Sequence, residues 1–512
     1  MEIKLDKIPN IEGISAINGE YDAKNVPAKK TETFSERMKH SVKIVDSLED
    51  AIRKCGLKDG MTISFHHHFR NGDNVINQVM DVIAGMGIKN LTVAASSLQK
   101  CHAPLIDHIK SGVIKRIETS GMRGELADAV SHGLMDIPVV FRSHGGRAAA
   151  IEEGDLHIDV AFLGAPTCDP YGNANGYNRD GDEGSCCGSL GYAILDAQHA
   201  DKCVIITDLI VPYPNAPFGI PESRVDYVVK VDSIGDSEKI MSGATRYTKD
   251  PKELLIAKAA ADAIEASGYF HDGFSMQMGS GGASLATARY LREKMLEKGY
   301  KARFALGGIT NQIVEMHEEG LIERILDVQS FDLGAAHSLR NNRFHQQINA
   351  SFYASYANRG AAVNQLDFCI LSATEIDTDF NINVMTGSDG VIMGAIGGHP
   401  DAAAGASCTI ITVPLMRGRI PCIIDHVTTV VTPGNTVDVV VTDRGIAVNP
   451  NRPDLKEKLI AAGLHVTTIE KLKELAENIV GKPEPIKYKD KIVGLVMYRD
   501  NTVIDVIREV ED

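Results

Sequence analysis

Residues 158–175 read IDVAFLGAPTCDPYGNAN, and residues 366–383 carry a related pattern, LDFCILSATEIDTDFNIN. At a shift of 208 positions, the two stretches share the identical pairs Asp159/Asp367, Leu163/Leu371, Ala165/Ala373, Asp169/Asp377, Asn173/Asn381 and Asn175/Asn383. The same shift aligns GVIKRI at 112–117 with GLIERI at 320–325. Two separated matches at one offset indicate an internal duplication, and so long a period indicates two whole domains rather than a solenoid.

Short apolar runs alternate with helical segments in both copies. In the first copy MTISF (61–65) precedes the polar turn HHHFRNGD and a helical stretch from residue 74. In the second, FSMQM (274–278) precedes GSGG and a helical stretch that ends near Gly299. Strand, turn and helix in this order are typical of a parallel sheet. We therefore predict an α/β chain with two tandem, related open-sheet domains, whose chemistry lies where the two copies face each other.

The 512-residue chain is too long for a single core, and we divide it into four parts. Residues 1–47 are polar and weakly periodic and form an N-terminal extension. Residues 48–240 and 241–481 form the first and second domains. Residues 482–512 form a strand-bearing C-terminal appendage.

Composition excludes several classes of function. The net charge of −15 argues against a nucleic-acid surface and against attraction to anionic membranes. The nine cysteines include no CxxC pair and no zinc-type Cys/His spacing, so we expect buried thiols and no metal site. The N-terminus has no apolar signal core, and no run reaches the ~20 apolar residues of a membrane span. These features predict a cytoplasmic location.

Two glycine-rich turns follow predicted strands of the second copy. Gly279, Ser280, Gly281 and Gly282 lie between a strand and a helix, where backbone N–H groups and the helix N-terminus can bind an anion. The pattern is neither a dinucleotide fingerprint nor a P-loop, and a plain tight turn is the alternative. Gly307 and Gly308 form a second glycine pair at a strand end, where open α/β sheets bind ligands.

The corresponding turn of the first copy carries His66, His67, His68 and Arg70. Histidine and arginine at a strand end can hold carboxylates through charge-assisted hydrogen bonds. A metal site is less favoured, because adjacent side chains on an extended chain point in opposite directions. The alternative is that one or two of these histidines only satisfy local backbone groups.

Three further candidates have weaker patterns. His144 and Arg147 lie in SHGGRAAAIEEGD (143–155), which is either a substrate loop or a turn that opens an amphipathic helix. Glu375 stands at a strand end where the first copy has Thr167, and it is either an acid, base or nucleophile or an exposed turn residue. Gly397, Gly398 and His399 belong to a loop of small residues (388–406), which suits an extended pantetheine arm or tight packing between the domains.

The chain resembles the CoA-transferase superfamily, and within it the family of citrate lyase alpha chains. The stretches that carry the resemblance are FHHHFRNGD, SHGGRAAAIEEGDLHIDVAFLGAPTCDPYGNANG, MGSGGASLA, FALGGITNQIVEMHEEGLI and GSDGVIMGAIGGHPDAAAGA, spread over nearly the whole chain. VVTDRGIAVNP (440–450) is a more general feature of the superfamily.

The resemblance implies that acetyl-carrier protein and citrate are converted into citryl-carrier protein and acetate. The carrier is a small gamma subunit with an arm derived from dephospho-CoA, and a beta subunit cleaves the citryl thioester. Free CoA thioesters can stand in for the carrier. No tightly bound cofactor and no metal is implied, and we expect a homo-oligomer.

One departure from the superfamily pattern bears on the mechanism. Many CoA-transferases have a Ser-Glu-Asn-Gly stretch whose Glu attacks the thioester, whereas this chain has Ala305–Gly308 (ALGG) there. We therefore expect citrate itself to attack the acetyl thioester, with Gly279–Gly282 and Gly307–Gly308 donating N–H groups to the oxyanions. The alternatives are a CoA-transferase for a simpler acid with Glu375 as nucleophile, and a non-catalytic subunit that binds an organic acid.

Overall fold

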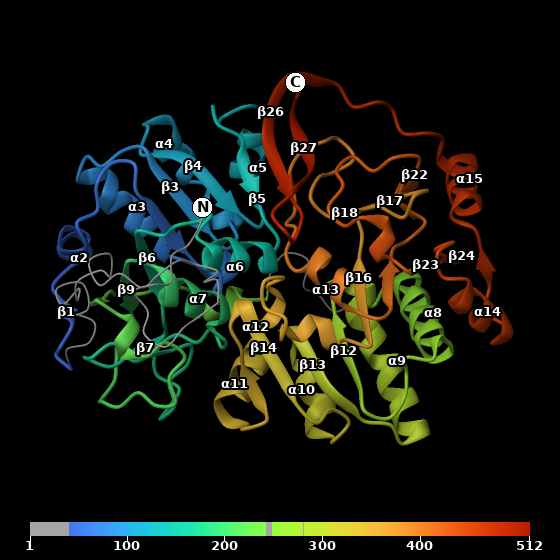
Figure 1. The fold of residues 1–512 in the computed structure, drawn as a ribbon, viewed down its shortest axis with the longest axis horizontal. Coiled ribbons are helices and arrows are strands. Elements are labelled where there is room, and N and C mark those ends of the chain that lie inside the picture. Colours follow the sequence, from blue (N-terminus) through green and yellow to red (C-terminus); the bar gives the residue numbers. More distant parts are fainter. Residues whose placement is uncertain (1–39, 242–247, 280, 512) are drawn as a thin grey trace, which may run out of the picture. The chain divides into compact units, whose positions relative to one another are not determined.

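Two large, mostly parallel sheets organise the computed structural model, which describes residues 40–241, 248–279 and 281–511 (Figure 1). The first sheet contains, in spatial order, β1 (Ile44–Val45), β11 (Tyr227–Lys230), β9 (Lys202–Thr207), β6 (Val160–Gly164), β2 (Thr62–Phe65), β3 (Leu91–Ala95), β4 (Ile114–Thr119), β5 (Val139–Phe141), β26 (Tyr488–Met497) and β27 (Val503–Val510). The second contains β15 (His345–Gln347), β14 (Ile325–Ser330), β13 (Ala302–Ile309), β12 (Phe274–Met278), β16 (Phe368–Ser372), β19 (Thr409–Thr412), β23 (Val439–Thr442), β24 (Gly445–Val448) and β25 (Val466–Thr467).

The strand orders of the two sheets confirm the duplication. The order β11-β9-β6-β2-β3-β4-β5 in the first sheet matches β23-β19-β16-β12-β13-β14-β15 in the second, strand for strand. Among the described strands of the two sheets, only β23–β24 and β26–β27 pair antiparallel. The predicted fold class, two tandem related open-sheet units, is therefore correct, and residues 41–512 group as one unit that contains both sheets.

The repeated aspartates satisfy backbone groups in the same way in both copies. Asp159 accepts a hydrogen bond from the Thr62 N–H (2.7 Å), and Asp367 accepts one from the Ser275 N–H (2.8 Å). Each therefore anchors the start of the central strand of its sheet. The cost of leaving a buried N–H unpaired explains why the duplication remains visible at these positions.

A small three-stranded sheet follows the repeated strand in each copy. The first is β10 (Leu209–Ile210), β7 (Thr167–Cys168) and β8 (Ala174–Asn175), and the second is β18 (Ile382–Asn383), β17 (Glu375–Asp377) and β22 (Ile423–Ile424). In the turn after β7, Asp169 accepts a hydrogen bond from the side-chain amide of Asn173 at 2.8 Å. In the turn after β17, Asp377 accepts the equivalent bond from Asn381 at 3.1 Å. The Asp–Asn pairs of the repeat are thus turn-forming pairs. A separate two-stranded hairpin is formed by β20 (Met416–Arg417) and β21 (Ile420–Pro421).

Helices follow the strands of both sheets. They are α2 (Leu48–Cys55), α3 (Val75–Gly85), α4 (Leu105–Lys110), α5 (Glu125–Ser131), α6 (His144–Glu153), α7 (Gly191–His199), α8 (Pro251–Ser267), α9 (Gly282–Lys298), α10 (Asn311–Glu318), α11 (Leu333–Asn341), α12 (Ala350–Ala354), α13 (His399–Gly405), α14 (Pro453–Ala461) and α15 (Ile469–Val480). The ends of helix α8 have typical capping residues, because Asp250 accepts from the Lys252 N–H and Gly268 ends the helix at φ 91°. Among the described residues, no helix combines the length and apolar character required to cross a bilayer.

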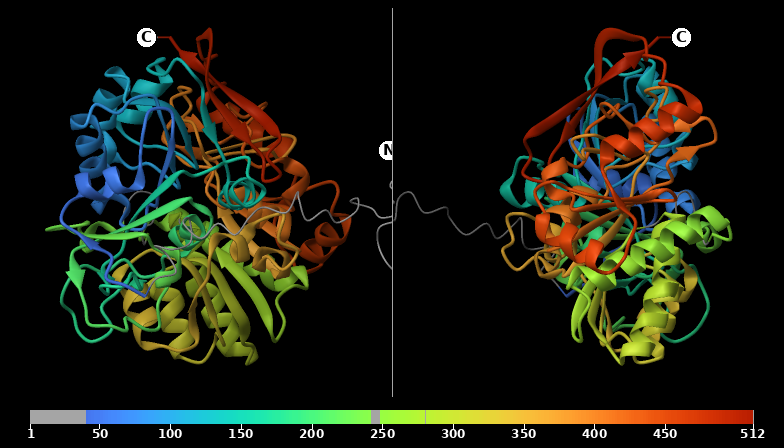
Figure 2. Two further views of the ribbon diagram at one scale, coloured as in Figure 1. Left: turned by 60° about the vertical axis from the view of Figure 1, so that its left-hand side comes forward. Right: turned by 90° about the vertical axis from the view of Figure 1, so that its right-hand side faces the viewer.

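The C-terminal strand pair belongs to the first sheet, although it follows all strands of the second sheet in the sequence. Strand β26 pairs in parallel with β5, and β27 then pairs with β26 as the outer strand (Figure 2). The predicted appendage therefore covers an edge of the first sheet, which would otherwise expose unpaired backbone groups. The predicted extension lies outside the described residues up to position 39.

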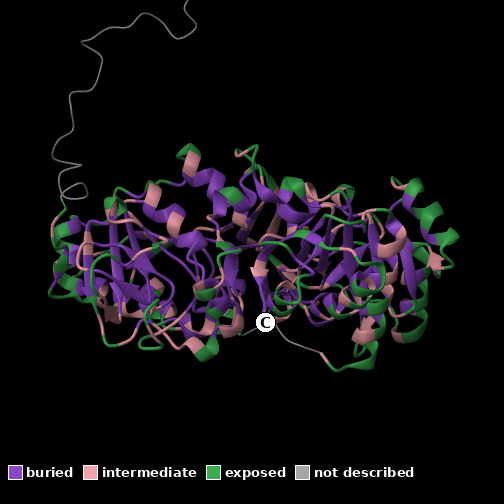
Figure 3. Cartoon of the chain, turned by 90° about the horizontal axis from the view of Figure 1, so that it is seen from below, coloured by how far each residue is buried: buried purple, intermediate pink, exposed green. Residues whose placement is uncertain are grey.

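Buried residues concentrate in the strands, and exposed residues lie mainly on the outer helices and turns (Figure 3). Continuous burial, as in β6 and β12, is typical of parallel strands covered on both faces. All nine cysteines are free, and only Cys101 and Cys186 are partly exposed. The prediction of buried thiols is confirmed for the other seven.

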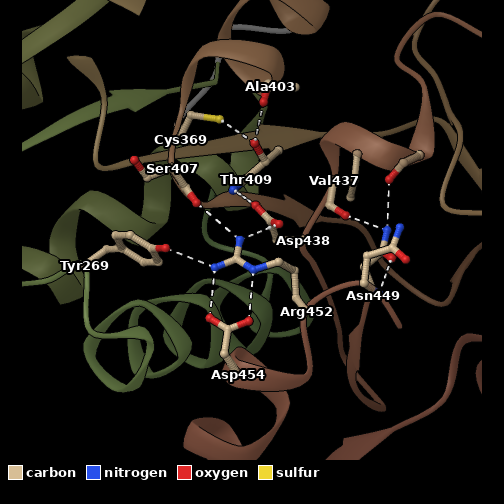
Figure 4. Close-up of polar contacts among 12 residues, drawn as sticks. Tyr269, Cys369, Ala403, Ser407, Thr409, Val437, Asp438, Asn449, Arg452 and Asp454 are labelled. Atoms are coloured by element: carbon tan, nitrogen blue, oxygen red, sulfur yellow. Dashed lines mark hydrogen bonds and ion pairs between the residues drawn. The ribbon is translucent and has the colours of Figure 1, made fainter. Parts of the chain in front are cut away.

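A polar cluster around Arg452 fixes the end of the second sheet (Figure 4). The Arg452 guanidinium donates to Asp454 (3.1 Å), Tyr269 (3.0 Å) and Asp438 (2.6 Å). Asp438 in turn accepts from the Thr409 N–H at the start of β19 (2.7 Å). Burial is the largest effect on the Asp438 carboxyl and raises its pKa, so the nearby Arg452 charge stabilises an otherwise unfavourable anion.

Replacing Arg452 with methionine is expected to lower the free energy of unfolding by about 1–3 kcal/mol. The methionine keeps most of the packing but leaves the Asp438 carboxylate without its cation. Arg444→Met is the matched control, because Arg444 is 57% exposed and its contact with Asp443 is 3.4 Å long. Urea unfolding followed by circular dichroism measures both variants, and equal stability of the two would contradict the assignment.

Candidate functional site

The carboxyl ends of both sheets open into one cavity of about 700 Å³. Its lining comes from the segments that follow β2, β3 and β4 in the first sheet and β12, β13, β14 and β16 in the second. The predicted site residues on its wall are His67, Arg70, His144, Gly279, Gly281, Gly282, Gly308, Gly397, Gly398 and His399. Ligands of open α/β sheets bind at this end of the strands, and the volume is that of a small-molecule site.

The histidine triplet divides between the wall and the core. His66 donates from Nε2 to the Gly164 carbonyl (2.8 Å), and His67 pairs through Nδ1 with the Ser96 hydroxyl (2.6 Å). His68 is fully buried, and neither ring nitrogen has a hydrogen-bond partner among the described residues. Only His67 reaches the cavity, so the alternative of locally satisfied histidines holds for His66.

The histidines of the site are neutral. Burial is the main cause and lowers the pKa of His67 and His68 well below the ordinary value, and it lowers that of His144 to about 3. The neighbouring charges of other histidines, and of Arg147 for His144, act in the same direction. Charge-assisted bonds from these histidines stay a prediction, and burial favours the neutral form of each ring. The histidines supply neutral donors and acceptors, and the positive charge comes from arginine.

The buried neutral histidines predict a loss of stability in acid. In the unfolded chain a histidine binds a proton below about pH 6.5, whereas buried His68 does not, so stability is present above that pH and falls as pH decreases. His68→Leu should flatten this decline by about 1.4 kcal/mol per pH unit.

Urea unfolding of His68→Leu and wild type between pH 6.5 and 4.5 tests the prediction. The exposed residue Leu255 carries no titratable group and provides the control variant Leu255→Gln, which should keep the wild-type slope. Identical slopes for wild type and His68→Leu would exclude a proton-linked role for the buried ring.

Arg70 is the buried cation of the first copy's turn. Its φ of 53° is unusual for a residue other than glycine, and its guanidinium lies 4.9 Å from the centre of the Phe331 ring. Burial lowers the pKa of Arg70 to about 10, so it stays charged at neutral pH. Held conformations of this kind occur where a side chain must be aimed at a ligand.

Gly308 provides the space that Phe331 occupies. A Cβ at position 308 would lie 2.1 Å from the Phe331 ring, which is too close for two carbon atoms. Gly307, at φ 103°, does not line the cavity, and strand β13 shifts register against β14 between the two glycines. The structure thus gives Gly308 a role as a site for close packing, which the prediction of an N–H donor did not include.

The glycine-rich turn at 279–282 presents a helix N-terminus to the cavity. Gly281 is the N-cap of the 17-residue helix α9, and no described side chain caps its first turn. Gly281, Gly282 and Ala283 line the cavity, so the first N–H groups of the helix are available to an anion there. The Gly279 N–H is already bonded to the Ile370 carbonyl (2.6 Å), and Ser280 lies outside the described residues.

His144 and Arg147 lie in a helix, as in the alternative of a turn that opens a helix. Ser143 caps helix α6, and His144 follows in its first turn with its ring on the cavity wall. Arg147 is buried behind the wall, where both terminal nitrogens bond to Asp196 at 2.7 and 2.8 Å. It does not reach the cavity and acts in packing the helix against α7.

The small-residue loop crosses from the second copy to the first. Ala395 bridges to Gly121, and the Gly397 carbonyl accepts from the His144 N–H (2.8 Å). His399 lines the cavity, but both its nitrogens are engaged, by Thr432 at 2.7 Å and by the Ser372 carbonyl at 2.9 Å. The predicted loop therefore forms a wall up to Gly398 and continues as helix α13.

Glu375 does not reach the cavity. Its buried carboxylate accepts from the Asn383 amide (3.0 Å) and from the Thr428 N–H (3.0 Å) within the small sheet. Among the described residues that line the cavity, Glu253 in the first turn of α8 is the only carboxylate. A covalent mechanism with a carboxylate nucleophile would therefore use Glu253, because Glu375 does not reach the cavity.

Sequence reasoning missed several polar residues of the wall, namely Arg123, Tyr192, Gln277, Gln329 and Tyr353. Gln277 donates to the Tyr353 hydroxyl (3.0 Å), and Gln329 donates to the His67 carbonyl across the two copies (3.1 Å). Each glutamine is the second-last residue of a fully buried strand, in FSMQM and ILDVQS.

Comparisons with known proteins agree on one family. The model of the family described as citrate lyase, alpha subunit, matches residues 41–510. The citrate lyase alpha chain of Escherichia coli K12 is 52% identical over the full length of both chains, and that of Klebsiella pneumoniae is 54% identical over 98% of this chain and 99% of its own.

Solved structures agree as well. A Streptococcus mutans chain described as the alfa subunit of citrate lyase, solved in complex with citrate, is 58% identical with a TM-score of 0.89 over 92% of each chain. A chain of a Pseudomonas malonate decarboxylase hetero-tetramer, solved with malonate, has a TM-score of 0.64 at 16% identity over 88% of this chain and 90% of its own. The second likeness concerns the fold alone.

Proposed function

Because the chain belongs to the family of citrate lyase alpha subunits, we propose that it exchanges acetyl for citryl on the thioester of an acyl carrier protein. Acetyl-carrier protein and citrate become citryl-carrier protein and acetate. The partners in this proposal are the carrier-protein subunit with its dephospho-CoA-derived arm and a lyase subunit that cleaves citryl thioester.

The observation that carries the proposal is the shared cavity. Arg70 supplies a buried positive charge from the first copy, and the first turn of α9 supplies N–H groups from the second. A polycarboxylate anchored by the arginine and a thioester carbonyl at the helix end would meet between the two sheets. Holding both reactants in one site is the main requirement of an exchange reaction.

We place the chemistry in two acyl transfers without a covalent enzyme intermediate. A citrate carboxylate oxygen attacks the acetyl carbonyl carbon, the C–S bond breaks, and a thiolate and a mixed citryl-acetyl anhydride result. The thiolate then attacks the citryl carbonyl carbon of the anhydride, and acetate leaves with the bridging electron pair. Neither step requires a proton from the protein.

Both steps pass through a tetrahedral oxyanion, which the neutral wall is suited to stabilise. The first N–H groups of α9 and a ring N–H of His144 can donate to it. A neutral imidazole donates without forming an ion pair that would retain the acetate product. The low pKa of His144, near 3, keeps this donor neutral over the working pH range.

The test compares substitutions of two carboxylates, Glu253, which lines the cavity, and Glu375, which does not. Acetyl-CoA and citrate are mixed with wild type, Glu253→Gln and Glu375→Gln, and citryl-CoA is followed by mass spectrometry. We expect wild type to form citryl-CoA, and we expect each variant to retain kcat within about tenfold, because direct exchange uses neither carboxylate as a nucleophile.

Trapping with hydroxylamine or borohydride is done on the same samples. Absence of any adduct on an active enzyme supports direct exchange. An adduct on the Glu253 or Glu375 peptide, together with loss of activity in that variant, would show a covalent mechanism instead. Failure of wild type to form citryl-CoA even from acetylated carrier protein would overturn the transferase assignment.

A further inference from the structure

Arg123 is a cavity residue that the proposed chemistry leaves without a role. It follows β4 and lines the cavity, and no hydrogen bond or ion pair engages its guanidinium within the described part of the chain. Burial lowers its pKa from the ordinary arginine value. A partly buried cation without a partner is costly unless a ligand supplies the counter-charge.

The backbone around Arg123 is fixed on both sides. The Met122 N–H donates to the Gly394 carbonyl (3.2 Å), and Gly121 bridges to Ala395. On the other side, a Cβ at Gly124 would lie 3.0 Å from the Lys100 side chain. The segment therefore has little room to move, and the arginine is presented to the cavity from a rigid support.

Lys100, which lies against Gly124, also connects this segment to the turn of Arg70. The Lys100 N–H donates to the Asn71 side chain (3.2 Å), and the Cys101 thiol contacts the Arg70 carbonyl (3.5 Å). After burial, the charge of Arg123 is the second cause of the lowered pKa of Arg70. Two guanidiniums thus share one end of the cavity, where their repulsion favours binding of an anion between them.

We propose that Arg70 and Arg123 together bind the two carboxylates of the polycarboxylate substrate that do not react. Arg123 thereby determines the preference for a tricarboxylate over a monocarboxylate. The inference rests on the proposed exchange function and adds the residue that selects its acceptor. With two carboxylates held at the arginine end, the third is left to face the thioester at the helix end.

Acetate provides the internal comparison, because it also exchanges at this site but has only the reacting carboxylate. Acetyl-CoA with labelled acetate therefore measures the site without the proposed contact, and acetyl-CoA with citrate measures it with the contact. For Arg123→Gln we expect the ratio of kcat/KM for citrate to kcat/KM for acetate to fall about 30-fold or more. The change should appear mainly in KM for citrate, and Arg123→Lys should recover part of the ratio.

Arg116→Gln is the matched control, since Arg116 is an exposed residue of the same strand β4 and does not line the cavity. Its ratio should equal that of wild type. Isothermal titration of each chain with citrate alone provides a readout without turnover, and Arg123→Gln should bind citrate more weakly by a similar factor.

The outcomes separate this inference from the proposed function. If wild type exchanges neither acetate nor citrate, the exchange function fails. If wild type exchanges both and Arg123→Gln lowers both equally, or changes neither, the specificity assignment fails while the exchange function stands. A selective loss with citrate supports it.

Discussion

Arg70→Gln is expected to lower kcat/KM for citrate by about 100-fold to 1000-fold. Arg70 is only 7% exposed, so a carboxylate bound to it is shielded from water. Charge-assisted hydrogen bonds in such surroundings are among the strongest that side chains form, and a planar guanidinium can hold a carboxylate with two of them. Glutamine keeps polarity and similar length but removes the charge.

Two companion variants define the cause of the loss. Arg70→Lys keeps the charge but loses the planar contact with Phe331, so it should recover only part of the activity. Arg116→Gln removes an exposed arginine and should behave as wild type. The measurement is initial-rate formation of citryl-CoA over a range of citrate concentrations, with melting temperatures recorded for every variant.

Full activity of a folded Arg70→Gln variant would exclude the arginine from citrate binding. A loss that is accompanied by a large drop in melting temperature would assign Arg70 to stability instead. Its φ of 53° makes the distinction practical, because glutamine meets the same backbone requirement as arginine at this position.

The sequence predicts the fold well because the signals of the fold are local. Asp159 and Asp367 each bind the first backbone N–H of a central strand, so their side chains are required in both copies and the repeat persists there. Capping residues such as Asp250 and Gly268 similarly mark helix ends without reference to distant parts of the chain. The return of β26 to the first sheet has no such local signal, because its neighbour β5 lies more than 300 positions earlier.

Much of the candidate site is predictable from the positions of strand ends. His67, Arg70 and Gly281 were found because they come just after strands whose carboxyl ends meet at one edge of a sheet. Arg123 was missed although it also follows a strand, β4, and Tyr192 was missed because helix α7 brings it to the cavity through tertiary packing.

Charge states were the least predictable property. Three adjacent histidines suggest positive charge, but burial makes their neutral forms more stable. The same limit applies to the carboxylates, because Glu375 is enclosed by its own small sheet while Glu253 reaches the cavity. Burial depends on the packing of both copies, which no local pattern reports.

Gly308→Ala is expected to reduce kcat/KM for citrate by about 100-fold, nearly as much as the loss of Arg70 itself. The added Cβ would lie 2.1 Å from one atom of the Phe331 ring and 2.2 Å from another, so the ring must move. Phe331 carries the Arg70 guanidinium on its face, and displacement of the ring shifts the charge that binds citrate. Gly308 is in this sense a positioning residue.

A second substitution distinguishes positioning from general damage. Phe331→Leu removes the ring through which the added Cβ acts, so Gly308→Ala should weaken citrate binding less in the Phe331→Leu background than in the wild-type background. Gly85→Ala is the matched control, because a Cβ at Gly85 meets nothing within 4 Å. A smaller effect of Gly308→Ala on KM for citrate in the Phe331→Leu background supports the chain of contacts from residue 308 through the ring to Arg70. If Gly308→Ala raises KM for citrate equally in both backgrounds, or if Gly308→Ala has wild-type KM and kcat, the glycine does not act through Phe331.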